Sequence, residues 1–300
     1  MDIVRRDAGI DVSAPAKVNL FFEVLAKRSD GYHEIETLMV PIGLFDHLRV
    51  VNDPAGNIEL SARWSAPATV IEESGFGELP PADENLVTKA VKLLRERAGV
   101  KLGAKMWLTK RIPAAAGLGG GSSDAAAALA AVNELWQLGW TRDQLAELSA
   151  ELGSDVPFFF ARGAAMCRGR GEIIEPVGKL PSLHLVVVRP PEGLSTAAVY
   201  KACRASDQPR SPRELIDALR RGDQRRLGSL IYNRIEPAAR ELSTWIKRLE
   251  AEFSQLDCVV AQMSGSGTAY FAICRHAAHA RAIAGKLKQR GIGRIYVVRS

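Results

Sequence analysis

A short stretch between residues 113 and 129 reads PAAAGLGGGSSDAAAAL and constrains this chain more than any other. It places four glycines within five positions and then runs directly into alanines, the best helix formers. Glycine in regular structure costs about 0.5–1 kcal/mol relative to alanine, so a plain loop would be more stable with fewer glycines. The pattern predicts a backbone loop that leads into the N-terminus of a helix reaching Gly139.

A helix N-terminus presents unpaired N–H groups and the positive end of the helix dipole, so it favours anions. Glycines before it allow the backbone to approach a phosphate closely and to turn its N–H groups inward. The two serines that follow can contact phosphate, although they could equally cap the helix. We therefore predict a phosphate-binding site formed by Pro113, Ala114, Ala115, Ala116, Gly117, Leu118, Gly119, Gly120, Gly121, Ser122 and Ser123.

Several other motifs for phosphate binding or catalysis do not fit this stretch. A P-loop requires a lysine before its final serine or threonine, and none lies between Gly117 and Ser123. The dinucleotide-binding fingerprint fails because Ser122 stands where its last glycine should be. The companion motifs of protein kinases and the G-x-S-x-G elbow of serine hydrolases do not occur in the sequence.

Composition limits the class of protein. The 300 residues are 47% hydrophobic and 25% charged, which is typical of a folded protein of one or two domains. The net charge of +6 suits anionic small molecules and falls short of the dense basic patch of nucleic-acid binders. The cysteines lack CxxC spacing, no signal-like apolar region follows the start, and the longest apolar run is 125–132. We expect a cytoplasmic monomer or weak homodimer that binds neither nucleic acid nor membranes.

The order of the predicted elements indicates the fold class. Apolar alternation predicts strands over 18–25 and 33–42, joined as a hairpin by the Asp-Gly turn at 29–32. Hairpins come first and no regular βαβ repeat follows, so we expect an α+β fold in two halves. A composition shift at 161–171 places the boundary, and the expected domains are residues 1–165 and 166–300. The later elements are predicted as strands over 105–113, 183–191, 257–263, 269–274 and 294–299, and helices over 84–99, 141–153, 212–221, 236–252 and 276–290.

Three segments resemble motifs of the GHMP kinases. Residues 113–125, PxxxGLGGGSSDA in outline, resemble the nucleotide-binding motif of that family. PAKVNLFFEV (15–24) is similar to the N-terminal motif, and MSGSGTAYFAI (263–273) is similar to the C-terminal glycine motif. The resemblance implies an ATP-dependent small-molecule kinase that uses ATP and Mg²⁺. It also implies a ribosomal-protein-like N-terminal half, a ferredoxin-like C-terminal half and a cleft between them.

Two segments narrow the resemblance to one branch of the family. Residues 16–39 and the segment GSDVPFFF (153–160) resemble the members that phosphorylate a cytidine diphosphate-linked methylerythritol. That resemblance implies transfer of the γ-phosphoryl group of ATP to the 2-hydroxyl of the methylerythritol, within non-mevalonate isoprenoid synthesis. Asp155 would be the general base and Lys17 its partner, which orients the hydroxyl and offsets developing charge. The alternatives are that Asp155 caps a helix starting near Val156 and that Lys17 is an exposed lysine at a strand end.

The same resemblance implies binding residues. Tyr32 and Tyr200 would stack on the cytosine, and His33 would read its edge by hydrogen bonds. An ordinary hairpin turn is the competing interpretation of the Tyr32–His33 pair. Further substrate contacts are expected from Asn19, Thr196, Gly265, Ser266 and Gly267, although the last three could be only a tight hairpin turn. Asn85 and Lys110 would line the adenine or ribose pocket. The metal ligands stay open, because Ser123 and Asp124 are adjacent candidates and Asp124 could equally serve the helix dipole.

The sequence departs from this branch of the family at two places, and two other functions compete with the one that the resemblance implies. The segment 57–83 is long for this branch, and Ala114–Ala116 replace glycines that often precede the motif. Another GHMP kinase, of the mevalonate or homoserine type, would have no need of Tyr32, His33 and an aromatic residue at position 200. An RNA-binding module of related fold would need a basic, aromatic surface, which the mild charge does not favour.

Overall fold

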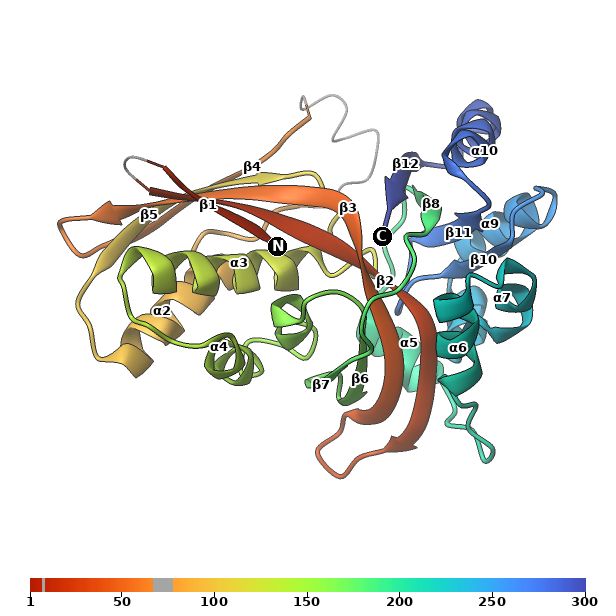
Figure 1. The fold of residues 1–300 in the computed structure, drawn as a ribbon, viewed down its shortest axis with the longest axis horizontal. Coiled ribbons are helices and arrows are strands. Elements are labelled where there is room, and N and C mark those ends of the chain that lie inside the picture. The colour runs from red at the N-terminus through yellow and green to blue at the C-terminus, as the bar shows by residue number, and fades with distance from the viewer. Residues whose placement is uncertain (7–8, 67–77) are drawn as a thin grey trace.

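The computed structural model describes residues 1–6, 9–66 and 78–300, and Figure 1 shows them as two lobes, each built on a β-sheet. In the first lobe, helices lie against one face of the sheet; in the second, helices pack beside a smaller sheet (Figure 1). The α+β fold in two halves, predicted from the order of elements, is therefore confirmed. No helix in the described ranges has both the length and the apolar character needed to cross a bilayer.

The first sheet has eight strands within the described residues, ordered β1-β2-β3-β5-β4, with β6 pairing β3 and β7, and β9 pairing β2. The second sheet has the order β10-β11-β8-β12. The strands of the first sheet are β1 (Asp2–Arg6), β2 (Gly9–Lys27), β3 (His33–Asp53), β4 (Ile58–Trp64), β5 (Gly103–Lys110), β6 (Ala165–Gly169), β7 (Ile173–Pro176) and β9 (Tyr232–Asn233). Those of the second are β8 (His184–Arg189), β10 (Val260–Met263), β11 (Tyr270–Cys274) and β12 (Arg294–Arg299).

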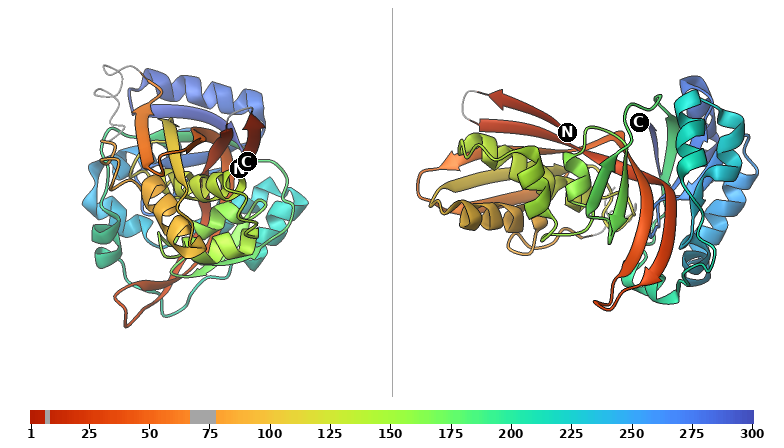
Figure 2. Two further views of the ribbon diagram at one scale, coloured as in Figure 1. Left: turned by 90° about the vertical axis from the view of Figure 1, so that its left-hand side faces the viewer. Right: turned by 60° about the horizontal axis from the view of Figure 1, so that its bottom comes forward.

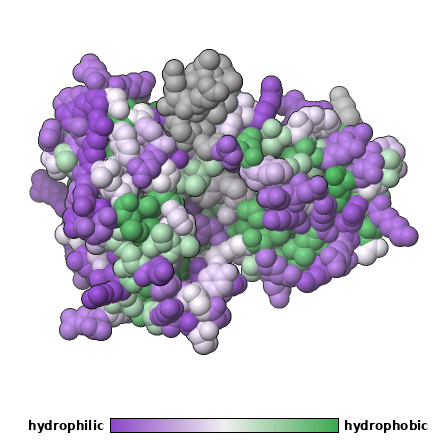
Figure 3. Space-filling view, turned by 180° about the vertical axis from the view of Figure 1, so that it is seen from behind, coloured by the Kyte–Doolittle hydropathy of each residue, from purple (hydrophilic) through white to green (hydrophobic). Residues whose placement is uncertain are grey.

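The helices connect and cover these strands. In chain order they are α2 (Leu86–Ala98), α3 (Gly120–Leu135), α4 (Arg142–Ser149), the 3₁₀ helix η1 (Pro157–Phe160), α5 (Thr196–Ala202), α6 (Arg213–Arg221), α7 (Gln224–Leu230), α8 (Glu236–Leu242), α9 (Thr244–Ser254) and α10 (Ala277–Gln289). The surface seen from behind is mainly hydrophilic toward the outer part of each lobe, and hydrophobic residues are visible over the middle of each lobe (Figure 3).

The hairpin of β2 and β3 joins the two lobes, as the right-hand view of Figure 2 shows. It contains the hairpin predicted for residues 18–25 and 33–42, and Gly31 takes a positive φ of +87° in its turn. The apolar residues of β2 enter three hydrophobic clusters in succession: positions 10–14, then 16–21, then 22–24. One long strand is thus anchored in both lobes, and its central residues lie where the lobes meet.

The alanine-rich helix forms as predicted and packs tightly. α3 begins at Gly120, directly after the glycine loop, and ends at Leu135, short of the expected Gly139. The side chains of residues 125–128 are fully buried. Because alanine is small, α3 can lie close to both α2 and the sheet, which fixes the direction of its N-terminus relative to the loop.

Some predicted boundaries differ from the observed ones. The region 161–171 was expected to separate the domains, yet it contains β6, which pairs with β3 of the first sheet. The proposed boundary after residue 165 therefore falls within that strand. The helix expected over 236–252 is two helices, because Ser243 is extended and its hydroxyl caps α9 by accepting from the Trp245 N–H at 3.2 Å. Within the segment 57–83, β4 occupies 58–64 and residues 67–77 lie outside the described part.

A buried ionic cluster secures the start of α3. The ammonium of Lys110, at the end of β5, pairs with Asp124 on α3 at 2.6 Å and with Asp46 on β3. Asp46 also accepts a backbone bond from Ile112 at 2.9 Å. All three charged side chains are at most 7% exposed. Although burial opposes its charge, the carboxylates of Asp124 and Asp46 raise the pKa of Lys110, and burial raises the pKa of Asp124.

We expect Lys110→Met to lower the free energy of unfolding by about 3–5 kcal/mol, because it leaves two carboxylates buried without their cation. Because burial raises the pKa of Asp124, its carboxylate binds a proton more readily in the folded state than in the unfolded state, so the loss of stability should shrink as the pH falls from about 8 to about 5. Urea unfolding at several pH values measures both effects. The control is Lys105→Met on the same strand, where the side chain is 42% exposed; a deficit as large there would contradict the assignment.

Candidate active site

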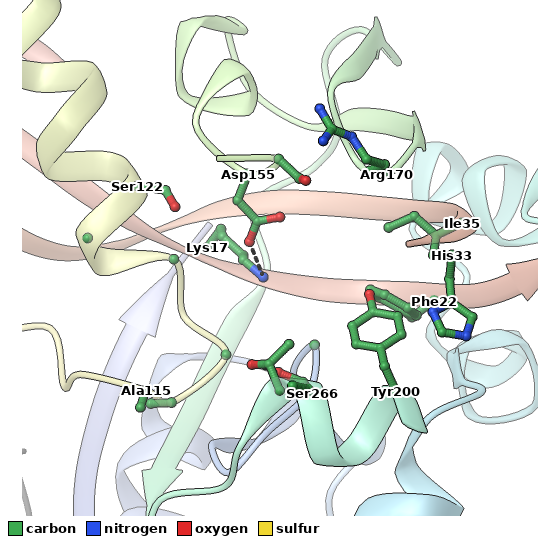
Figure 4. Close-up of a pocket in the computed structure, with 18 of the residues that line it drawn as sticks. Lys17, Phe22, His33, Ile35, Ala115, Ser122, Asp155, Arg170, Tyr200 and Ser266 are labelled. Carbon is green, nitrogen blue, oxygen red and sulfur yellow. Dashed lines mark hydrogen bonds and ion pairs between the residues drawn. The ribbon is translucent and has the colours of Figure 1, made fainter. Parts of the chain in front are cut away.

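A cavity of about 790 Å³ lies where the two lobes meet, within the range of small-molecule sites (Figure 4). Its walls come from β2, β3, the glycine loop, the segment before η1, α5 and the loop between β10 and β11. Most of the residues singled out in the sequence line it. These are Lys17, Tyr32, His33, Pro113, Ala114, Ala115, Ala116, Gly117, Gly119, Gly120, Gly121, Ser122, Asp155, Thr196, Tyr200, Gly265 and Ser266. Their individual roles stay predictions.

The glycine loop is held by backbone contacts from both lobes. The Lys17 N–H donates to the Leu118 carbonyl at 2.9 Å, and the Ala269 N–H donates to the Ala116 carbonyl at 3.0 Å. The Ser264 hydroxyl donates to the Gly117 carbonyl at 3.0 Å. These bonds use the carbonyls of the loop and leave the first turn of α3, with its orphan N–H groups, at the cavity wall.

Two glycines of the loop are required by close packing. Gly117 has φ of +73°, and a Cβ there would lie 2.1 Å from the Ser264 carbonyl oxygen. Gly119 has φ of +69°, and its Cβ would lie 3.0 Å from the Lys17 Cγ and 3.0 Å from the Phe159 Cζ. A side chain at Gly117 would therefore push the glycine loop away from the loop between β10 and β11, and one at Gly119 would push it away from Lys17 and Phe159. The two glycines therefore allow close packing around the loop, in addition to any close approach of a phosphate.

Lys17 and Asp155 form an ion pair at the centre of the cavity, with 3.3 Å between Nζ and Oδ2 (Figure 4). Lys17 also donates to the Asn19 Oδ1 at 2.7 Å, and the Asn19 amide donates to the Thr37 hydroxyl at 2.8 Å. Lys17 and Asn19 share one face of β2, between irregularities in its pairing with β3 on either side. Packing and the hydrogen bond to Asn19 on the same strand therefore orient the Lys17 side chain toward Asp155.

The structure does not agree with the two competing interpretations, in which Lys17 is an exposed lysine and Asp155 is a helix cap. The Lys17 side chain is 4% exposed, so it is not a solvated lysine at a strand end. Asp155 does not cap η1, because Val156 is the cap position and makes no side-chain cap bond. At 33% exposure, Asp155 instead reaches the cavity from one side while its partner is enclosed.

Aromatic rings gather at one end of the cavity. His33 and Tyr200 stack with 5.1 Å between ring centroids, and Phe22 meets Tyr200 edge-on at 6.4 Å. Tyr32, which was predicted to stack on the cytosine together with Tyr200, is 53% exposed at the rim. Burial and, to a smaller extent, Lys27 lower the pKa of His33, which keeps the imidazole neutral at pH 7 with one donor and one acceptor nitrogen. Burial, followed by the charge of Asp155, raises the pKa of Tyr200.

Some predicted residues lie outside the cavity wall: Asn19, Leu118, Ser123, Gly267, Asn85 and Lys110. Asn85 caps α2 by accepting from the Val87 N–H at 2.9 Å, and Lys110 is enclosed with its two carboxylates. Neither is among the residues that line this cavity, and their roles as adenine or ribose contacts stay predictions. Ser123 and Asp124 are buried beneath the loop, and the choice of metal ligand stays open. Asn19 does not line the cavity, but its side-chain oxygen accepts a hydrogen bond from the Lys17 ammonium.

Residues that the sequence did not single out complete the wall. Leu86, at the start of α2, and Phe22 and Ile35, on the hairpin, add apolar surface, and Arg170 adds a cation. Nothing in the local pattern around Arg170 indicates that the pairing of β6 with β3 brings it to the cavity that holds Lys17 and Asp155.

Comparison with known proteins decides the family. The model of the GHMP kinases N terminal domain matches residues 85–163, and that of the GHMP kinases C terminal domain matches residues 215–293. These matches cover more than half of the chain. This chain belongs to the GHMP kinase family. It is an ATP-dependent small-molecule kinase.

This GHMP kinase is similar to several known proteins over most of its own length and most of theirs. It is 39% identical over 282 residues to the 4-diphosphocytidyl-2-C-methyl-D-erythritol kinase of Pelotomaculum thermopropionicum, covering 93% of this chain and 94% of that protein. It is 40% identical to the enzyme of the same name from Shouchella clausii, covering 87% and 84%. A crystal structure of 4-(cytidine 5'-diphospho)-2C-methyl-D-erythritol kinase matches with a TM-score of 0.77 and 36% identity, covering 96% and 98%. Homoserine kinase from Cytophaga hutchinsonii, at 19% identity and a TM-score of 0.75, shares the fold.

We expect Gly117→Ala to lower the free energy of unfolding of this GHMP kinase by about 2–4 kcal/mol, since it adds left-handed strain and a clash with Ser264. Gly121→Ala is the matched control. Gly121 is helical, and the atom closest to its Cβ position is the Leu86 Cδ1 at 3.6 Å. We expect that variant to be neutral or slightly more stable. Equal destabilisation of both variants in thermal or urea unfolding would contradict the packing role of Gly117.

Proposed function

We propose that this kinase transfers the γ-phosphoryl group of ATP to the 2-hydroxyl of 4-diphosphocytidyl-2-C-methyl-D-erythritol. The observation that carries the proposal is one cavity with the Lys17–Asp155 pair at its centre and the rings of His33 and Tyr200 at one end. Flat apolar rings beside a neutral imidazole suit a pyrimidine base. The relatives that bear the name of this activity, at 39–40% identity over most of the chain, support the same substrate.

The pair can perform the transfer as follows. An Asp155 carboxylate oxygen accepts the proton of the substrate hydroxyl, whose oxygen forms a bond to the γ-phosphorus. The bond from that phosphorus to the oxygen bridging the β- and γ-phosphates breaks, and ADP leaves with the electron pair. Lys17 stabilises the negative charge that develops on the transferring group. Asp155 then releases its proton to solvent.

The glycine loop holds the triphosphate in this proposal. Backbone N–H groups at the start of α3, with the Ser122 hydroxyl at the wall, would donate to phosphate oxygens. Mg²⁺ neutralises β- and γ-phosphate charge and is bound through phosphates with one or two carboxylates. Among the described lining residues, Asp155 carries the single carboxylate. The chain therefore fits a metal held mainly by the nucleotide, with Asp155 and Ser122 as the groups within the cavity that could contact it.

The wider setting is part of the same proposal. The reaction would belong to non-mevalonate isoprenoid synthesis in the cytoplasm, performed by a monomer or weak homodimer without nucleic acid as partner. The N-terminal lobe, predicted as residues 1–165, would bind ATP and carry Lys17 and Asp155. The C-terminal lobe, predicted as residues 166–300, would form the substrate side together with His33 of the hairpin. The hydrogen bond of 2.8 Å between the Thr196 and Ser266 hydroxyls supports the second assignment, because it joins α5 to the β10–β11 loop at the wall.

A coupled ADP-release assay tests the substrate. The purified kinase is given Mg²⁺ and ATP with 4-diphosphocytidyl-2-C-methyl-D-erythritol, mevalonate or homoserine in separate reactions. We expect turnover with the cytidine compound at least about a thousandfold more efficient than with the others, because only it can use the aromatic end. Comparable or greater efficiency with mevalonate or homoserine would replace the proposal with one of those activities.

We expect Asp155→Asn to reduce kcat by about a hundredfold to ten-thousandfold, since the amide cannot accept the hydroxyl proton. The KM for ATP should stay within about threefold, because the glycine loop, not Asp155, grips the nucleotide. Asp217→Asn, on α6 and 58% exposed, is the control for loss of one carboxylate. Wild-type kcat in the Asp155 variant would remove this residue as the base.

A further inference from the structure

Arg170 is the one arginine among the described lining residues, and it is outside the catalytic pair. It lies in the tight turn between β6 and β7, beside Gly169 and Gly171, which have φ of +71° and +123°. Its guanidinium lies over the ring of Tyr32, 4.9 Å from the centroid. Its side chain is 29% exposed, so the charge is partly enclosed at the wall.

This turn spans the distance between the two ends of the cavity. At one end, Arg170 contacts Tyr32, next to the stacked rings. At the other, a Cβ on Gly171 would lie 3.7 Å from the Asp155 Oδ1 and 3.4 Å from the Ser154 carbonyl oxygen. Figure 4 shows Arg170 on the Asp155 side of the cavity, across from Ser266. A ligand reaching from the aromatic rings to Lys17 and Asp155 would therefore run alongside this turn.

We propose that Arg170 binds the diphosphate group of the cytidine-bearing substrate. The inference rests on the proposed function, in which the base lies at the aromatic end and the reacting hydroxyl at Asp155. The diphosphate joins those two parts of the substrate, so it occupies the stretch of the cavity beside the β6–β7 turn. A guanidinium matches phosphate oxygens with two parallel hydrogen bonds, whereas an ammonium acts as a point charge.

The contacts of Arg170 leave its guanidinium able to bind a phosphate group. Its ion pair within the described residues is with Glu172, whose Oε1 lies 3.6 Å from Nε, longer than a hydrogen bond. Glu172 is held separately, because its other oxygen accepts from the Arg170 backbone N–H at 2.6 Å. Two further cations of the wall, Lys27 and Lys201, are exposed and long, so they are less well placed to fix the position of a phosphate.

Binding of CDP and of cytidine, measured by competition in the kinase assay, tests the inference. Loss of a charge-assisted contact should weaken inhibition by CDP about tenfold to a hundredfold in Arg170→Gln, and inhibition by cytidine by less than about threefold. Arg170→Lys, which keeps the charge but not the fork, should fall between the two. Arg213→Gln, an exposed arginine on α6, controls for the change of net charge. Thermal unfolding of each variant checks that it is folded.

The outcomes separate this inference from the proposed function. If Arg170→Gln weakens cytidine as much as CDP, the arginine only supports the Tyr32 ring and the inference is wrong. An unchanged CDP affinity and an unchanged KM for the cytidine substrate also overturn it, while wild-type turnover of that substrate keeps the proposed function intact. If the wild-type kinase neither turns over that substrate nor binds CDP, the proposed function itself fails.

Discussion

The enclosed ammonium of Lys17 is the interaction on which the rest of the site depends. Its strand is anchored in the cores of both lobes, its backbone N–H binds the glycine loop, and its side chain reaches Asp155 from the opposite wall. A buried charge is tolerated only where partners surround it, and Asn19 and Asp155 supply them. The same lysine therefore connects the glycine loop, Asp155 and the hairpin that carries His33.

This arrangement explains why the glycines are where they are. Gly117 and Gly119 allow the loop to lie against Ser264 and Lys17, so the start of α3 faces the same space as the ion pair. From the other side, the ionic cluster around Lys110 holds that helix to the sheet. Phosphoryl transfer depends mainly on position and electrostatics, and both are set here by backbone packing around one cavity.

Much of this was predictable from local sequence. The hairpin and the glycine loop leading into α3 depend on short motifs whose chemistry is visible in the residues themselves. The pairing of Lys17 with Asp155 was expected only from the resemblance to the GHMP kinases, because the residues alone favoured a helix cap for Asp155. Other features depend on contacts between distant segments. The burial of Lys110 depends on Asp46, 64 positions away, while its role as a nucleotide contact stays a prediction. Arg170 reaches the cavity because β6 pairs with β3 of the first sheet. The break at Ser243 was missed because a capping serine inside an apolar helical pattern has little signal of its own.

A double-mutant cycle of Lys17→Met and Asp155→Asn tests the central claim most directly. If the ammonium acts by placing Asp155 and sharing the charge of one transition state, the two residues act as a unit. Removing both should then reduce kcat by no more than about threefold beyond the worse single variant. Losses that multiply in the double variant would show that Lys17 and Asp155 act independently, and would contradict the account.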